Sequence, residues 1–141
     1  RRQRQMCIRD RNNTEYQDFL TDVCEDLKES LAIAKEAGIS DEQIILDPGV
    51  GFGKTYEQNL SIIHHMECLK QFGYPVLLAT SRKSVIGLTL DLEADQRVEG
   101  TLVTTVMGVE KGASFVRVHD VKENMRAIQM TQAILREKKE K

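Results

Sequence analysis

A glycine-rich loop at 47–55, DPGVGFGKT, is the segment whose residues most clearly suggest chemistry. Asp47 opens it with a carboxylate that can accept hydrogen bonds. Gly51 and its neighbouring glycines permit backbone angles that let a flat ligand approach closely, and Phe52 is the one aromatic residue. The spacing fits neither a P-loop nor a dinucleotide-binding fingerprint, because each lacks one required glycine. Taken alone, Asp47 could bind a donor-rich ligand or could only cap its own loop.

Two further polar motifs follow apolar runs. SRKS combines the hydroxyl of Ser81 with the cation of Lys83, which could hold an anion or could form an ordinary solvated loop. RVHD contains Arg117 and His119, whose alternation places both on one face of a strand. Burying the charge of an arginine in a sheet is energetically unfavourable unless the arginine is paired, so a purely solvent-exposed surface role is disfavoured. We expect Asp120 to cap the following helix rather than to act as a catalyst.

These motifs together predict a ligand with two contrasting ends. A donor-rich heterocycle would pair with Asp47 near Phe52. A phosphate or diphosphate would lie against Arg117, His119 and Lys83, and arginine would make the strongest contacts. The sequence shows no Ser-His-Asp or Cys-His set, so it favours electrostatic stabilisation of a departing anion over covalent catalysis.

The periodicity of apolar residues predicts how these motifs are positioned. It indicates strands at 44–46, 75–80 and 115–118, and helices at 14–38, 55–72, 91–112 and from 120 onward. Strands that alternate with amphipathic helices form βαβ units around a parallel sheet, an α/β fold. Right-handed crossovers then bring the carboxyl ends of all three strands, and the three motifs, to one edge.

Two details of these helices follow from residue spacing. Thr14 and Gln17 fit a capping box at the start of the first helix. In the last helix, the apolar residues Met125, Ile128 and Leu135 are expected to face inward.

Composition bounds the class of protein. The chain has 141 residues, with 20 Lys plus Arg against 22 Asp plus Glu, which excludes a whole-surface electrostatic grip on nucleic acid. No apolar stretch approaches the roughly 20 residues that span a membrane. Residues 1–11 carry five arginines without periodicity, and we expect a disordered or non-native leader there, followed by one domain at 12–141.

Cysteine and histidine usage indicates neither a disulfide framework nor a metal centre. Cys7, Cys24 and Cys68 are odd in number and widely spaced, which suits a reducing cytoplasm. His64 and His65 are neighbours on a predicted helix and should not share a face, so a shared metal is disfavoured.

In this order, ILDPGVGFGK (45–54), SRKSVIG (81–87) and RVHDV (117–121) resemble motifs of the dihydropteroate synthases, with a likeness covering about 12–136. The resemblance implies a TIM (β/α)8 barrel, which needs roughly 250 residues. This chain would then supply the C-terminal βα units with the last three strands. By itself such a fragment would be inactive.

The resemblance also implies an activity. A hydroxymethyl-dihydropterin diphosphate condenses with 4-aminobenzoate to give dihydropteroate and pyrophosphate on the route to folate, and Mg²⁺ assists the leaving diphosphate. It implies that the Mg²⁺ ligand lies in the missing N-terminal part, with none in this chain. A homodimer through the final helices and competition by sulfonamides are further family properties. Two alternatives stay open, namely a pterin-binding methyltransferase domain and a non-catalytic half-barrel that binds a ligand or partner.

Residue roles follow from the same resemblance. The catalytic candidates are Asp47, Lys83 and Arg117, and the substrate-binding candidates are Asp47, Gly51, Phe52, Ser81, Lys83, Arg117 and His119. Asp47 and Lys83 would contact the pterin, and Arg117 would stack on it. Phe52 and Ser81 would lie at the aminobenzoate. Arg117, together with His119, would hold the diphosphate.

Overall fold

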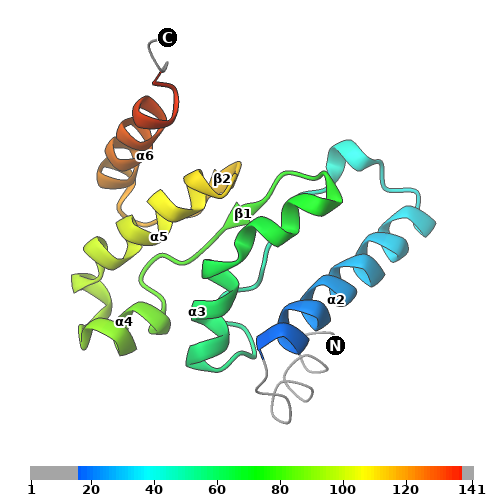
Figure 1. Ribbon diagram of the computed structural model, residues 1–141, viewed down its shortest axis with the longest axis horizontal. Helices are drawn as coiled ribbons and strands as arrows, with labels where there is room; N and C mark the ends of the chain where they lie inside the picture. The colour runs from blue at the N-terminus through cyan, green and yellow to red at the C-terminus, as the bar shows by residue number, and fades with distance from the viewer. Residues whose placement is uncertain (1–15, 138–141) are drawn as a thin grey trace.

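The computed structural model describes residues 16–137, with side chains from residue 18 onward. Its elements, in chain order, are α2 (Tyr16–Glu36), η1 (Asp41–Gln43), α3 (Tyr56–His64), η2 (Met66–Phe72), β1 (Leu77–Leu78), α4 (Ser84–Leu90), η3 (Ala94–Gln96), α5 (Val98–Glu110), β2 (Phe115–Val116) and α6 (Val121–Leu135). Helix α2 packs on α3, α3 on α4 and α5, and α5 on α6, so the long helices form a row in chain order (Figure 1). The structure therefore has the predicted α/β organisation.

The strands are parallel, as predicted, but shorter than the apolar runs. β1 pairs with β2 in parallel register, and the run at 44–46 pairs through an isolated parallel bridge between Leu46 and Val76, the residue before β1. Hydrogen bonds from Leu46 N to Pro75 O (2.9 Å) and from Leu77 N to Leu46 O (2.8 Å) hold this edge. The prediction of a strand at 44–46 is thus wrong in extent, because one bridge does not make a ladder, although the three segments do lie side by side.

Helix α2 confirms the first predicted helix. Its apolar stripe faces the rest of the molecule, with Val23 buried and Leu20, Leu27 and Leu31 half-buried. Gly38, with φ of 79°, lies just past the helix in the left-handed region that glycine adopts without strain. The proposed capping box at 14 and 17 lies outside the described side chains.

The helix predicted over 55–72 is interrupted. Thr55 caps α3 through a capping box with Gln58, but α3 ends at His64, and a 3₁₀ segment, η2, takes over after His65. Leu60 of α3 is 41 % exposed, whereas Met66 and Leu69 of η2 are buried.

The helix predicted over 91–112 begins in the wrong place. Helix α4 already starts at Ser84, and Asp91 is its left-handed C-cap, with φ of 53°. Helix α5 starts later, at Val98. The prediction treated SRKS as a possible loop, which holds for residues 81–83, but α4 begins at Ser84 and buries the apolar residues Val85 and Ile86.

The inward face of α6 is polar, contrary to the prediction. Met125 and Leu135 are 47 % and 54 % exposed and Ile128 is half-buried, while Asn124 is 1 % exposed. The reason is a hydrogen-bond network, because the Thr105 hydroxyl of α5 donates to Asn124 Oδ1 at 2.7 Å. Asn124 Nδ2 in turn donates to the carbonyl oxygen of residue 120 at 2.8 Å.

The core lies between the short sheet and the helices α2, α3 and α4. Its buried residues are Phe19, Val23, Leu46, Val50, Ile62, Ile63, Met66, Leu69, Val76, Leu78, Val85 and Ile86. Among the described helices, none has the length and hydropathy required to cross a membrane.

Candidate functional site

The loop after residue 46 and the loop after β1 meet at the carboxyl ends of the parallel segments. Lys83 Nζ donates to the carbonyl oxygen of Val50 and lies 4.7 Å from the centroid of the Phe52 ring. Asp47 and Arg117 both act electrostatically on the same ammonium group. Three of the predicted residues, Asp47, Phe52 and Arg117, are therefore brought together around Lys83.

The glycine loop is held in shape by its own polar groups. Asp47 Oδ1 accepts the Gly49 N–H at 2.7 Å, so this carboxylate does cap its loop, as one of the two interpretations held. Its side chain is nonetheless exposed at the site. The Gly51 N–H donates to Asn59 Oδ1 at 2.8 Å, and a Cβ at Gly51 would lie 3.1 Å from Cδ of Lys83. The absence of a side chain at Gly51 leaves room for the methylene groups of Lys83.

The electrostatic environment of Lys83 lowers its pKa. The largest cause is burial of the ammonium group, and the positive charge of Arg117 acts in the same direction. The negative charge of Asp47 opposes both. Lys83 is therefore a partly desolvated cation next to a carboxylate and an aromatic face, an arrangement that suits a flat, polar ligand.

Ser81 and His119 form a second contact between strand ends. The Ser81 hydroxyl accepts the backbone N–H of His119 at 3.1 Å and shares a hydrogen bond of 2.8 Å with His119 Nδ1. Ser81 is buried and His119 exposed. The serine therefore fixes the orientation of the imidazole and joins the loop after β1 to the one after β2.

Arg82 is turned away from the glycine loop. Its guanidinium donates to both carboxylate oxygens of Asp120, at 2.9 Å and 3.3 Å. This pair raises the pKa of Arg82 and lowers that of Asp120, in each case mainly through the side-chain hydrogen bond. Asp120 occupies the predicted N-cap position of α6, but its side chain makes no capping hydrogen bond there. The stronger partner is the arginine.

Arg117 is exposed, whereas the sequence argument placed it in a buried sheet. Strand β2 ends one residue earlier, at Val116, and the Arg117 backbone N–H still bonds to Leu78 O at 3.0 Å. Its side chain therefore projects beyond the ladder, where solvent or a ligand can reach it.

Three supporting residues were missed by sequence reasoning. Asn59 is 4 % exposed and holds the Gly51 N–H from helix α3. Lys54 Nζ donates to Gly49 O (2.9 Å) and Phe52 O (3.1 Å), which closes the loop on itself. Arg97 donates to Arg82 O at 2.8 Å. A polar residue on the inward side of a helix is the only signal that could have indicated Asn59.

The described residues contain no cluster of three or more His, Cys, Asp or Glu side chains that could hold a metal ion. Asp47 is the single carboxylate that acts on Lys83. These residues therefore do not fit Mg²⁺ by themselves.

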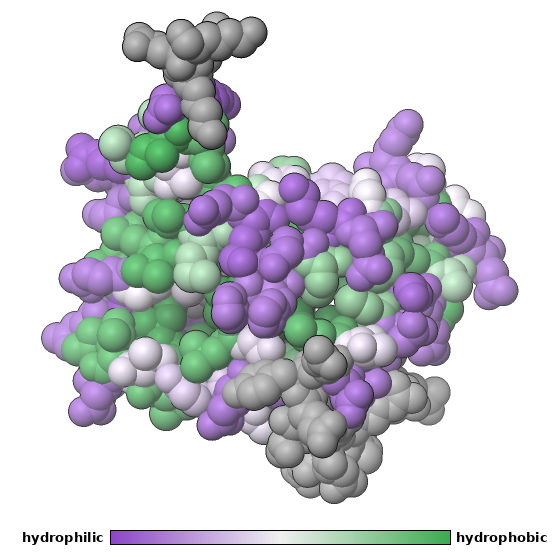
Figure 2. All heavy atoms as spheres, viewed as in Figure 1, coloured by the Kyte–Doolittle hydropathy of each residue, from purple (hydrophilic) through white to green (hydrophobic). Residues whose placement is uncertain are grey.

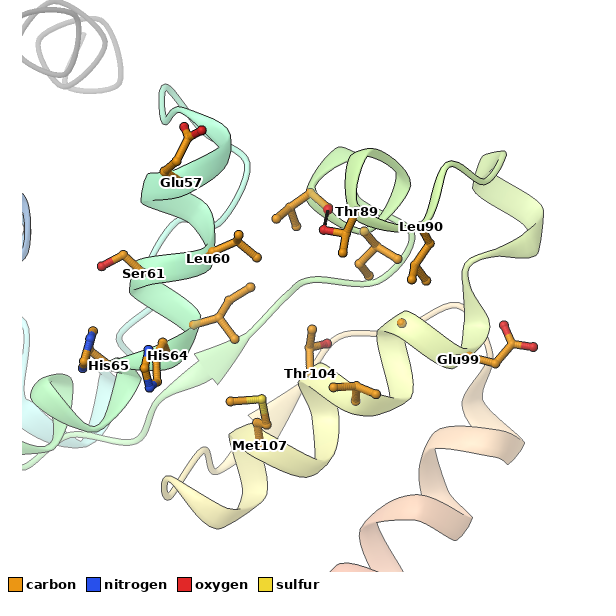
Figure 3. A pocket seen from close by; sticks show the side chains of 15 residues that line it. Glu57, Leu60, Ser61, His64, His65, Thr89, Leu90, Glu99, Thr104 and Met107 are labelled. Carbon is orange, nitrogen blue, oxygen red and sulfur yellow. Dashed lines mark hydrogen bonds between the residues drawn. The ribbon is translucent and has the colours of Figure 1, made fainter. Parts of the chain in front are cut away.

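A separate apolar groove of about 810 Å³ lies between α3, α4 and α5 (Figure 3). Leu60 of α3 and Met107 and Thr104 of α5 line it, together with both histidines of the 64–65 pair. The two imidazole rings stack at 4.3 Å, so the expectation that they do not share a face is wrong, because the helix ends between them. None of the seven predicted site residues lines this groove.

The sequence is similar to known proteins along most of its length. It is 58 % identical over 130 residues to the dihydropteroate synthase of Clostridium beijerinckii, which covers 92 % of this chain and 48 % of that protein. A structure of dihydropteroate synthase from Clostridium difficile in the presence of pteroic acid aligns with a TM-score of 0.84 at 48 % identity, over 89 % of this chain and 47 % of the other. The Yersinia pestis dihydropteroate synthase in a sulfonamide drug complex aligns at 0.83 and 35 % identity, over 88 % and 45 %.

The chain thus spans about half the length of the relatives that it matches. The sequence model described as pterin binding enzyme matches residues 2–119, a range that includes residues 2–11, which the quoted motifs did not cover. The two motifs around Asp47 and Lys83, and Arg117 with His119, all fall inside it. With more than half of its residues matched, the chain belongs to the family of pterin-binding enzymes.

Proposed function

We propose that this chain is part of a dihydropteroate synthase. The reaction would join 6-hydroxymethyl-7,8-dihydropterin diphosphate to 4-aminobenzoate, giving 7,8-dihydropteroate and pyrophosphate in folate biosynthesis. The observation that carries the proposal is the cluster of Asp47, Phe52 and Lys83 at the strand ends, in a chain 58 % identical to a protein named dihydropteroate synthase. The pterin-binding methyltransferase alternative lacks such support among these relatives.

We further propose that the chain provides the last three strands of an eight-stranded (β/α) barrel. The three side-by-side parallel segments and the coverage of 48 % of the relative support this assignment. In such barrels the active site lies at the carboxyl ends of the strands, where the two loops meet here. The remaining strands would come from a part of the protein outside this sequence.

At the pterin, Asp47 would accept hydrogen bonds from the amino-pyrimidine edge. One of its oxygens holds the Gly49 N–H, which fixes the carboxylate plane. Lys83 would contact the pterin ring from the side of Val50 and Phe52. When the diphosphate departs before the amine attacks, the pterin methylene carries a delocalised cation, and the negative charge of Asp47 stabilises it.

At the diphosphate, Arg117 and His119 would bind the leaving group. Arg117 is exposed and offers bidentate hydrogen bonds, and His119 is held by the buried Ser81. The resemblance assigned Ser81 to the aminobenzoate carboxylate. Its two bonds to His119 support an orienting role instead.

At the aminobenzoate, the half-exposed ring of Phe52 would pack against the aromatic substrate beside Gly51. Sulfonamides resemble this substrate, and they would compete at the same place. Mg²⁺ is proposed only for the longer protein, with its ligand outside this chain, and no step described here depends on it. A cytoplasmic homodimer that contacts itself through the final helices completes the proposal.

Titration of the dihydropterin diphosphate into the whole protein that contains this chain tests the proposal. We expect Asp47→Asn to weaken binding more than tenfold, which corresponds to about 1.4 kcal/mol or more. Asp18→Asn, an exposed carboxylate on α2, serves as the matched control and should bind normally. Pyrophosphate release that depends on both substrates supports a synthase. Unchanged affinity of the Asp47 variant removes this residue from the site, and binding without turnover favours a binding module.

A further inference from the structure

Two cysteines that lie far apart in the sequence meet where α2 packs on η2. Cys24 is on α2 and Cys68 on η2, and both are half-buried. The side-chain amide of Gln71 connects them, because its Nε2 donates to Cys24 Sγ at 3.3 Å and to the carbonyl oxygen of Cys68 at 2.8 Å. Cys24 also acts electrostatically on the Cys68 thiol, which agrees with their position on either side of Gln71. The sequence pattern, with no close pair of cysteines, gave no indication of this contact.

The surroundings give the two sulfurs different roles. Burial raises the pKa of Cys68 to about 12, and the charge and hydrogen bond of Cys24 act in the same direction. Cys68 therefore keeps its proton at neutral pH. The Cys24 sulfur accepts a hydrogen bond from the side-chain amide of Gln71. A protonated thiol at Cys68 and a hydrogen-bonded sulfur at Cys24 thus lie on either side of one glutamine.

We propose that Cys24 and Cys68 are a redox-sensitive dithiol that low-molecular-weight disulfides, such as oxidised glutathione, convert into an intramolecular disulfide. The Cys24 thiolate attacks one sulfur of oxidised glutathione and expels one glutathione thiolate. The Cys68 sulfur, on losing its proton, then attacks the Cys24 sulfur and expels the second. The protein loses two electrons and two protons, and two glutathione thiols are formed, so the exchange balances.

The disulfide would link α2 to the segment that precedes β1. The cysteine pair lies on elements that precede β1, whereas the candidate site lies at the carboxyl ends of the strands. In the described hydrogen bonds, neither cysteine contacts any of the seven site residues. The disulfide therefore acts on the packing of α2 and leaves the chemistry of the site alone. In a reducing compartment such a bond forms only under oxidising conditions, so the dithiol would sense them.

The test uses the chain with Cys7→Ser, so that only Cys24 and Cys68 remain, in buffers of oxidised and reduced glutathione. After acid quenching and alkylation, we expect mass spectrometry to find the tryptic peptide 12–28 joined to peptide 55–70. The effective concentration of the two thiols, obtained from their disulfide equilibrium with glutathione, should be at least tenfold higher in the folded chain than in urea. By linkage, the disulfide would then stabilise the folded state by about 1.4 kcal/mol.

Additional Cys24→Ser and Cys68→Ser changes, each made in the Cys7→Ser chain, are the matched controls and should yield only a glutathione adduct on the remaining thiol. The proposal is overturned if the Cys7→Ser chain gives glutathione adducts without the internal cross-link. Equal effective concentrations in buffer and in urea overturn it as well, because the folded structure would then contribute nothing to the pairing.

Discussion

At the scale of single residues, Lys83 connects the features of the candidate site. Its Nζ donates to the carbonyl oxygen of Val50 and lies over the face of the Phe52 ring. The negative charge of Asp47 raises its pKa, and the positive charge of Arg117 lowers it. A lysine in this position is partly removed from water, which disfavours its charged form. Its protonation therefore reports directly on whether the loops pack as the structure describes.

We predict that Lys83 titrates below the ordinary lysine value of 10.5 in the folded chain. The unfolded chain then binds more protons between the two pKa values, so the free energy of unfolding should rise with pH across that window. The Cε chemical shift of Lys83, followed by NMR against pH, measures the midpoint. In urea the midpoint should return to about 10.4. A folded midpoint at or above 10.5 would contradict the described burial.

At the scale of elements, small and polar side chains decide how the helices lie on the sheet. Helix α5 meets β1 at Gly108, and it turns Thr101, Thr104 and Thr105 inward rather than its valines. The Thr104 hydroxyl bonds to Thr80 at 2.6 Å. These contacts allow a close approach that an apolar stripe of large residues would prevent.

We predict that Gly108→Ala destabilises the chain. The added Cβ would lie 2.6 Å from Cδ2 of the buried Leu78, and overpacking of this kind costs about 1–3 kcal/mol. The gain in helix propensity offsets about 1 kcal/mol of that cost, which leaves a net loss of roughly 1 kcal/mol. Urea denaturation followed by circular dichroism measures it. Val103→Ala, at an exposed position of α5, should stay within about 0.5 kcal/mol, and an equally small effect at Gly108 would exclude the close contact.

At the scale of the whole molecule, apolar side chains gather on the side formed by α4, α5 and α6 (Figure 2). The large exposed residues of this surface are Leu88, Leu90, Val103, Val121, Met125, Met130, Ile134 and Leu135. A contiguous apolar surface of this kind is typical of an interface with another protein or another part of the same protein.

We predict a homodimer through α5 and α6 in the whole protein. Charges on both helices, Val103→Glu with Met130→Glu, should shift it to the monomer at micromolar concentration, because each would bury an unpaired carboxylate. Sedimentation velocity measures the state. Ile39→Glu, an exposed change between α2 and η1, is the control and should leave the dimer intact. A wild-type monomer, or charged variants that stay dimeric, would rule out this interface.

The candidate site was predictable where it depends on strand order. Parallel strands put the residues that follow them at one edge, so Asp47 and Lys83 could be grouped from the sequence alone. The contacts between loops could not be predicted in the same way. Arg82 pairs with Asp120, 38 positions away. From the local sequence alone, Arg82 could equally well bind an anion and Asp120 could equally well cap a helix.

The sequence by itself determined the α/β pattern, the parallel strand order and the three motifs, because these depend on local periodicity and on the handedness of crossovers. Only the tertiary structure decided the break at His65, the polar face of α6 around Asn124, and the meeting of Cys24 with Cys68. For the face of α6 and for the two cysteines, the physical reason is a partner distant in the chain. A hydrogen bond or a close contact between two such residues leaves no periodic trace in either segment.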